Sequence, residues 1–104
     1  MQFVQLRRYT IQEGGMDAFV AWWRGLIPIR ERYGYRLLFA VQDASGTEFT
    51  WAVAGDRPIA ELDAVYNASP EREEQWRSNP GVVVASSATD VTVLGGDWPA
   101  GSAA

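Results

Sequence analysis

Aromatic side chains are the residues of this chain whose type and spacing most directly suggest chemistry. Two of them, Trp22 and Trp23, adjoin within a segment of helical periodicity. Aromatic rings offer large apolar contact surfaces, and Tyr and Trp add one polar atom each. If the domain holds a cleft, six residues are candidates to line it: Tyr9, Trp22, Trp23, Phe39, Trp51 and Tyr66. The alternative is that they form an ordinary core, because large aromatics dominate the interiors of small domains.

Residue types that are missing exclude several kinds of catalysis. The chain has no cysteine, histidine or lysine, and all nine basic residues are arginine. This excludes disulfides, zinc sites built on Cys or His, Ser-His or thiol nucleophiles, and Schiff-base chemistry. A metal could bind only through oxygen ligands, and the acidic run Glu71, Glu73 and Glu74 lacks a calcium-loop spacing. We therefore expect neither a metal nor a cofactor.

The remaining acid and base groups are Asp, Glu, Tyr and Arg. No carboxylate falls on the side of a predicted strand that would face a cleft. This disfavours acid–base catalysis. It remains compatible with a cofactor-free oxygenation, in which an electron-rich substrate itself reacts with oxygen and the protein binds and desolvates it.

Length and composition indicate one globular domain. The chain has 104 residues, 47% of them apolar and 21% charged. No apolar run approaches the roughly 20 residues of a membrane helix, and the N-terminus lacks the apolar core of a signal peptide, so we expect a cytoplasmic protein without a membrane partner. The net charge of −4 and the absence of a basic stripe disfavour nucleic-acid binding.

The order of predicted elements gives the fold class. Apolar periodicity and turn signals predict strands at 3–11, 35–43, 47–55 and 82–94, and helices at about 16–33, 58–69 and 70–79. This is the βαββαβ order of the ferredoxin-like α+β fold, with a four-stranded antiparallel sheet and helices on one face. We expect a single domain over residues 1–96 and a flexible tail at 97–104.

The hairpin at 35–55 suggests what lies on each side of the sheet. A three-residue loop over 44–46 would pair Asp43 with Thr47, and hence Phe39 with Trp51, on a face that helices must cover. The other face is too apolar for solvent, so we expect a second subunit's sheet to pack on it. Its expected interface residues, with Arg36 paired to a carboxylate, are Arg36, Leu38, Ala40, Thr50 and Ala52.

Several motifs resemble the NIPSNAP-like family of the dimeric α/β-barrel superfamily. They are Leu6-Arg7 and Tyr9-Thr10 in the first strand, the Gly-Met-Asp-Ala-Phe start of the long helix, and Pro28 followed by Arg32-Tyr33-Gly34-Tyr35-Arg36. Glu48-Phe49-Thr50-Trp51 and the Ser69-Pro70 helix start complete the set, so the resemblance covers about residues 3–94. It implies a homodimer in which two sheets form a barrel and each subunit keeps a cleft between its sheet and its helices.

Two functions follow as hypotheses. In the first, the homodimer binds a small apolar or aromatic molecule in the cleft and acts on it as a cofactor-independent monooxygenase or cyclase. In the second, the protein is a non-catalytic dimerisation or interaction module whose aromatics are structural. Fold alone does not decide between them. A fully packed interior would favour the second.

Overall fold

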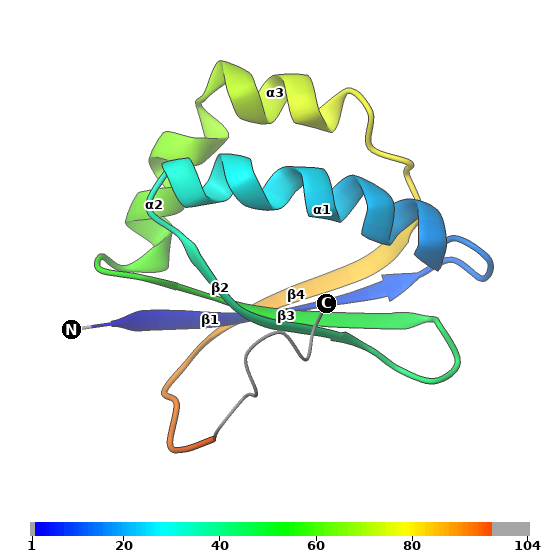
Figure 1. Cartoon of the computed structure of the whole chain (residues 1–104), viewed down its shortest axis with the longest axis horizontal. Coiled ribbons are helices and arrows are strands. Elements are labelled where there is room, and N and C mark those ends of the chain that lie inside the picture. Colours follow the sequence, from blue (N-terminus) through cyan, green and yellow to red (C-terminus); the bar gives the residue numbers. More distant parts are fainter. Residues whose placement is uncertain (1, 97–104) are drawn as a thin grey trace.

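The computed structural model describes residues 2–96 as one α+β sandwich, and the tail expected at 97–104 lies outside these residues. Figure 1 shows two layers, a sheet with helices on one side of it. The elements in chain order are β1 (Phe3–Ile11), α1 (Met16–Arg32), β2 (Arg36–Gln42), β3 (Glu48–Gly55), α2 (Ile59–Asn67), α3 (Pro70–Trp76) and β4 (Val83–Val91).

The sheet has the ferredoxin-like topology expected from the sequence. Its strand order is β2-β3-β1-β4, and every neighbouring pair is antiparallel. Helix α1 lies along the sheet, and α3 lies over α1 on the side away from the sheet (Figure 1). The predicted fold class is therefore confirmed.

Local sequence signals explain where the helices begin. Asp17 lies in the first turn of α1, where its charge favours the helix dipole, and Arg30 and Arg32 lie in the last turn. The side chain of Ser69 caps α3 by accepting a hydrogen bond from the Arg72 backbone N–H at 3.1 Å. Pro70 follows at the first helical position, where its missing N–H costs nothing.

The register predicted for the hairpin is wrong near its turn. Asp43 pairs with Glu48 through a backbone hydrogen bond of 3.0 Å, so the loop is one residue longer than expected. The Asp43 carboxylate explains this, because its Oδ1 accepts hydrogen bonds from the backbone N–H groups of Thr47 and Glu48, both at 3.0 Å. Gly46 does adopt the expected left-handed conformation, with φ of +74°. A bulge in β2 around Leu38 then restores the predicted pairing of Leu37 with Val53.

The shifted register moves residues 39–42 to the opposite face of the sheet, and two of them are predicted site residues. Phe39 pairs with Ala52 instead of Trp51, so it lies on the face without helices and not in the helix-covered core. Ala40 pairs with Trp51 and packs against the helix-covered core, so it is not on the expected interface face. Both corrections have one cause, because a one-residue slip turns every side chain to the other face.

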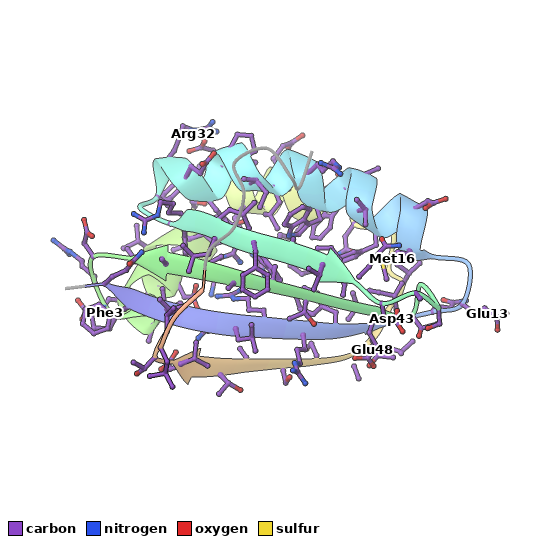
Figure 2. All side chains as sticks on the ribbon, turned by 60° about the horizontal axis from the view of Figure 1, so that its bottom comes forward. Phe3, Glu13, Met16, Arg32, Asp43 and Glu48 are labelled. Carbon is purple, nitrogen blue, oxygen red and sulfur yellow. The ribbon has the colours of Figure 1, made fainter. Side chains whose placement is uncertain are left out.

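The main core lies between the helices and the sheet, and its largest fully buried side chains are Trp51, Tyr66 and Phe19. The opposite side of the sheet, here called the open face, is seen in Figure 2 with no helix over it. A smaller apolar cluster lies there, in which Val4, Ala52 and Ala54 pack with Leu6, Leu38 and Phe39. Both faces of the sheet thus carry apolar side chains, but helices cover only one of them.

Candidate functional site

A cleft of about 740 Å³ opens between α1, α3 and the β1–β4 half of the sheet. Two observations explain why it exists. Every residue of β4 is exposed, so no helix packs down on that strand. The β4 side chains that face the cleft are also small, and include Ser86 and Ala88. The cleft therefore forms where the helix layer leaves the sheet uncovered.

Aromatic rings form much of the cleft wall. Tyr9 comes from β1, Phe19, Trp22 and Trp23 come from α1, and Trp76 comes from α3. Adjacent rings pack edge to face, with centroids 5.6 Å apart for Tyr9 and Phe19 and 5.2 Å apart for Trp22 and Trp76. Such contacts hold each ring in place before any ligand binds.

The adjacent tryptophans divide their contacts between two layers. Trp23 is buried and packs edge to face on Phe49 and Trp51 of the sheet. Trp22 is half-buried and points to α3, where its Nε1 donates to the Gln75 carbonyl oxygen at 2.9 Å. The Gln75 amide donates back to the Trp22 carbonyl oxygen at 3.0 Å. The side chains of neighbouring helix residues point about 100° apart, so Trp23 contacts the sheet while Trp22 contacts α3.

The six residues predicted to line a cleft occupy three places. Tyr9, Trp22 and Trp23 line it. Trp51 and Tyr66 are fully buried behind the wall, and Trp51 donates through Nε1 to the Tyr9 hydroxyl at 3.1 Å. Phe39 lies on the open face and borders a second, smaller hollow of about 450 Å³ between α1 and β2.

Three arginines also line the cleft, and the sequence analysis did not select them as candidates. They are Arg7 of β1, Arg30 of α1 and Arg72 of α3. For two of these arginines, the spacing in the sequence indicates a position beside the aromatic residues. Arg30 follows Trp23 and Leu26 on one apolar helix stripe, at spacings of three and four. Arg7 shares its strand face with Tyr9, two residues on.

Arg30 is enclosed by aromatic rings. It is only 6% exposed, and its Cζ lies 4.4 Å from the ring centroid of Tyr66, 4.7 Å from that of Tyr35 and 5.2 Å from that of Trp51. Burial lowers the pKa of the Arg30 guanidinium, and repulsion from Arg7 lowers it further. Arginine nevertheless stays protonated in proteins, so the cleft wall contains a buried positive charge.

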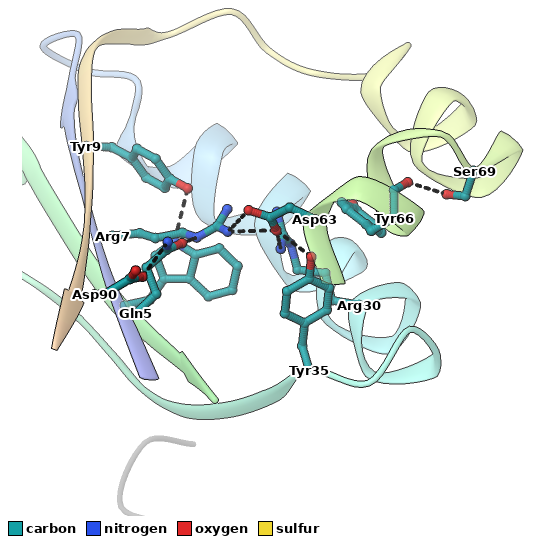
Figure 3. A network of polar contacts seen from close by, with 10 residues as sticks. Gln5, Arg7, Tyr9, Arg30, Tyr35, Asp63, Tyr66, Ser69 and Asp90 are labelled. Atoms are coloured by element: carbon teal, nitrogen blue, oxygen red, sulfur yellow. Dashed lines mark hydrogen bonds and ion pairs between the residues drawn. The ribbon is translucent and has the colours of Figure 1, made fainter. Parts of the chain in front are cut away.

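Asp63 of α2 neutralises part of this charge, as Figure 3 shows. Arg7 donates through Nη2 to both carboxylate oxygens of Asp63, at 3.1 and 3.2 Å. The Tyr35 hydroxyl donates to the same carboxylate, whereas Arg30 Nη1 stays 3.8 Å from it. Burial, followed by the hydrogen bond to Asp63, raises the pKa of Tyr35. Asp63 is thus bound mainly by Arg7 and Tyr35.

Several buried polar atoms of the wall lack a hydrogen-bond partner among the described residues. They are Trp23 Nε1, Arg30 Nε, Arg30 Nη1 and Arg72 Nε, and all belong to residues that line the cleft. The Tyr66 hydroxyl, behind the wall, is also unpaired. Each of these four wall atoms is a hydrogen-bond donor.

Among the described residues, no Asp or Glu lines the cleft. Within residues 2–96, no group of three or more carboxylates is placed to hold a metal ion. None of the helices in this part of the chain has the length and apolar character needed to span a bilayer. The cleft is therefore aromatic and cationic in a protein whose net charge is −4.

No protein-family model and no curated protein matches the chain. Solved structures with the same architecture include an uncharacterized NIPSNAP domain protein from Burkholderia xenovorans, with a TM-score of 0.77, 19% identity, and coverage of 93% of this chain and 100% of that one. A NIPSNAP-like domain protein from the same organism has a TM-score of 0.74 and 21% identity, with coverage of 94% of this chain and 90% of that one. A proposed antibiotic biosynthesis monooxygenase from Nitrosomonas europaea has a TM-score of 0.71 and 14% identity, with coverage of 89% of this chain and 90% of that one. At these identities the likeness concerns the fold, and it confirms at that level the resemblance to NIPSNAP-like proteins.

Proposed function

We propose that this protein is a homodimer whose subunits each bind a small aromatic molecule in the cleft and act on it without a cofactor. The observation that carries the proposal is the cleft itself, about 740 Å³ with five aromatic rings in its wall. Ligand sites in proteins are hollows of this size, mostly apolar, with a few polar groups that orient the ligand. The alternative of a purely structural module predicts a packed interior, which this cleft argues against.

The lining residues limit the chemistry that we propose. Among the described residues, the titratable side chains in the wall are those of Tyr9 and three arginines, so none of them offers a carboxylate or an imidazole as a general base. An oxygenation fits this set if the substrate supplies the electrons. For example, oxidation of a ring methylene to a carbonyl by O₂ places one oxygen atom in the product and releases the other as water. The protein would hold the substrate and exclude bulk water.

The test combines ligand capture with a variant that fills the cleft. Native mass spectrometry of protein purified from its own host should show a dimer with extra mass bound to it. In Ala88→Phe, a large ring would occupy the cleft floor, and the bound mass should disappear. Ala64→Phe is the matched control, because Ala64 is exposed on α2 and does not line the cleft.

A second assay covers ligands that are lost during purification. A panel of fused-ring aromatics should raise the melting temperature of the wild type and of Ala64→Phe, but not of Ala88→Phe, because binding to the folded state stabilises it. No extra mass, together with no shift from any member of the panel, would refute the binding function. An equal response of all three proteins would place binding outside the cleft.

A further inference from the structure

We propose that the aromatic molecule bound in the cleft carries an anionic oxygen group, such as a carboxylate, and that Arg30 is the residue that binds it. The inference rests on the proposed binding function and adds the charge of the ligand and the residue that recognises it. Three features support it: unpaired donors, the balance of charge, and the aromatic surroundings of Arg30.

The unpaired donors in the cleft wall favour a ligand that offers a hydrogen-bond acceptor. Buried polar groups in proteins nearly always have a partner, and leaving one unpaired is costly. Here four donors have no partner in the part of the chain that the structure describes: Trp23 Nε1, Arg30 Nε, Arg30 Nη1 and Arg72 Nε. A ligand oxygen accepts hydrogen bonds and an anionic oxygen accepts the strongest ones. Rotation about the side-chain torsions of Arg30 would turn an N–H towards such an oxygen in the cleft.

The charges around the cleft are also unbalanced in favour of an anion. Arg7, Arg30 and Arg72 line it, and no carboxylate does. Asp63 is the nearby acid, and it is already bound by Arg7 at 3.1 and 3.2 Å and by the Tyr35 hydroxyl. Arg30 lies 3.8 Å from Asp63, beyond hydrogen-bond distance. Asp63 therefore neutralises Arg30 only in part, and an anionic ligand would complete the neutralisation of this buried cation.

The third feature is the aromatic environment of Arg30. Its guanidinium lies against the rings of Tyr35, Trp51 and Tyr66 at 4.4 to 5.2 Å. These contacts favour the charged form, since cation–π attraction acts at the ring face. The planar guanidinium also matches a carboxylate in two parallel hydrogen bonds. Arg30 is thus held among aromatic rings, while its Nε and Nη1 lack hydrogen-bond partners among the described residues.

The test compares two probes that differ in charge but hardly in shape, 2-naphthoate and 2-naphthamide, by isothermal titration calorimetry. A charge-assisted hydrogen bond that replaces an unpaired donor should make the naphthoate bind about 10- to 100-fold tighter to the wild type. In Arg30→Gln the two affinities should become equal. Arg24→Gln is the matched control, because Arg24 is exposed on the same helix and does not line the cleft.

A measurement on the wild type keeps the proposal testable if Arg30→Gln does not fold. In protein labelled with ¹⁵N at arginine, the Nε–H resonance of Arg30 should move when naphthoate is added and stay in place with naphthamide. A purely structural Arg30 would respond to neither probe.

The outcomes separate this inference from the proposed function. If both probes bind equally well to the wild type and compete for the cleft, the binding function stands and the anion inference is wrong. If naphthoate is preferred and Arg30→Gln keeps that preference, Arg30 is not the residue that reads the charge. If neither probe nor any member of the aromatic panel binds, both proposals fail.

Discussion

At the scale of single residues, Asp63 is the acid on which the buried cations of the site depend. It pairs with Arg7, accepts the Tyr35 hydroxyl and lies near Arg30. Asp63→Asn would leave two neighbouring guanidinium groups without a negative charge. Because the Asp63 side chain is 27% exposed and solvent screens part of the effect, we expect a loss of about 2 kcal/mol in the free energy of unfolding.

Urea denaturation measures this loss, and Glu71→Gln is its control. Glu71 also binds an arginine and a tyrosine, Arg32 and Tyr33, but at the exposed edge of the helix layer. Its removal should therefore cost clearly less stability than the removal of Asp63, because solvent screens an exposed ion pair. Equal losses in the two variants would show that burial does not distinguish the two clusters.

The buried tyrosines predict a loss of stability at high pH. Burial raises the pKa of Tyr35 and of Tyr66 above the ordinary value of 10.0. The folded state therefore holds these protons more tightly than the unfolded state does. Their contribution is fully present below pH 10 and is lost as the pH rises above it, by up to about 1.4 kcal/mol per pH unit for each group.

Tyr66→Phe isolates one of these contributions. The Tyr66 hydroxyl has no hydrogen-bond partner among the described residues, so its removal should cost little at neutral pH. The free energy of unfolding, measured by urea between pH 9 and 11.5, should then fall less steeply than in the wild type. An unchanged slope would mean that Tyr66 ionises as easily in the folded state as in the unfolded state.

The sequence predicted the aromatic part of the site better than its charged part. Tyr9, Trp22 and Trp23 could be identified because ring size and strand or helix periodicity locate them. Arg30 shares the same helical stripe, but a charged residue on an apolar stripe usually extends its head to solvent. Three rings keep it inside, those of Tyr35 just before β2, Trp51 of β3 and Tyr66 of α2, and only the tertiary structure brings them together.

At the scale of elements, α3 forms the roof of the cleft and is attached mainly to α1. The reciprocal hydrogen bonds of Trp22 and Gln75 and the ring contact of Trp22 with Trp76 join the two helices. Gln75→Ala removes one of these bonds. We expect amide hydrogen exchange in residues 70–76 to become faster, while the free energy of global unfolding falls by about 1 kcal/mol.

The control for this prediction is Glu73→Ala. Glu73 lies on the same short helix, but it is exposed and its side chain pairs with Arg77, at 3.8 Å, instead of with α1. Exchange over residues 70–76 should therefore stay as in the wild type. If Gln75→Ala also leaves exchange unchanged, the ring contact alone holds the roof in place.

The hairpin shows where pattern reasoning at the level of elements reaches its limit. The alternation in β3 placed Phe49, Trp51 and Val53 on the helix-covered face, and the structure agrees. The loop length depended on the Asp43 side chain, which accepts hydrogen bonds from the backbone N–H groups of Thr47 and Glu48. A loop one residue shorter would place these two N–H groups differently. The bulge at Leu38 then offsets the longer loop. Two compensating irregularities leave the strand ends in register and are invisible in the apolar pattern.

At the scale of the whole molecule, the open face is the surface that we propose for dimerisation. Its apolar cluster and the half-exposed residues around it, such as Val41 at 49% exposure, lie on a sheet face that no helix of the described residues covers. With the observed register, the proposed interface keeps Arg36, Leu38, Thr50 and Ala52, loses Ala40 and gains Phe39. Ala52 is already buried within the subunit, so a charge there would test folding rather than association.

Thr50→Arg is therefore the sharper test of the dimer. Thr50 is half-buried on the open face, beside Arg8 on β1, so a second arginine would place like charges in the middle of the proposed interface. Sedimentation equilibrium should show a dimer for the wild type and a folded monomer for Thr50→Arg. Val65→Arg is the matched control, because Val65 is 63% exposed on α2, on the other side of the molecule, and this variant should stay dimeric. A monomeric wild type would refute the dimer, and a dimeric Thr50→Arg would move its interface away from the open face.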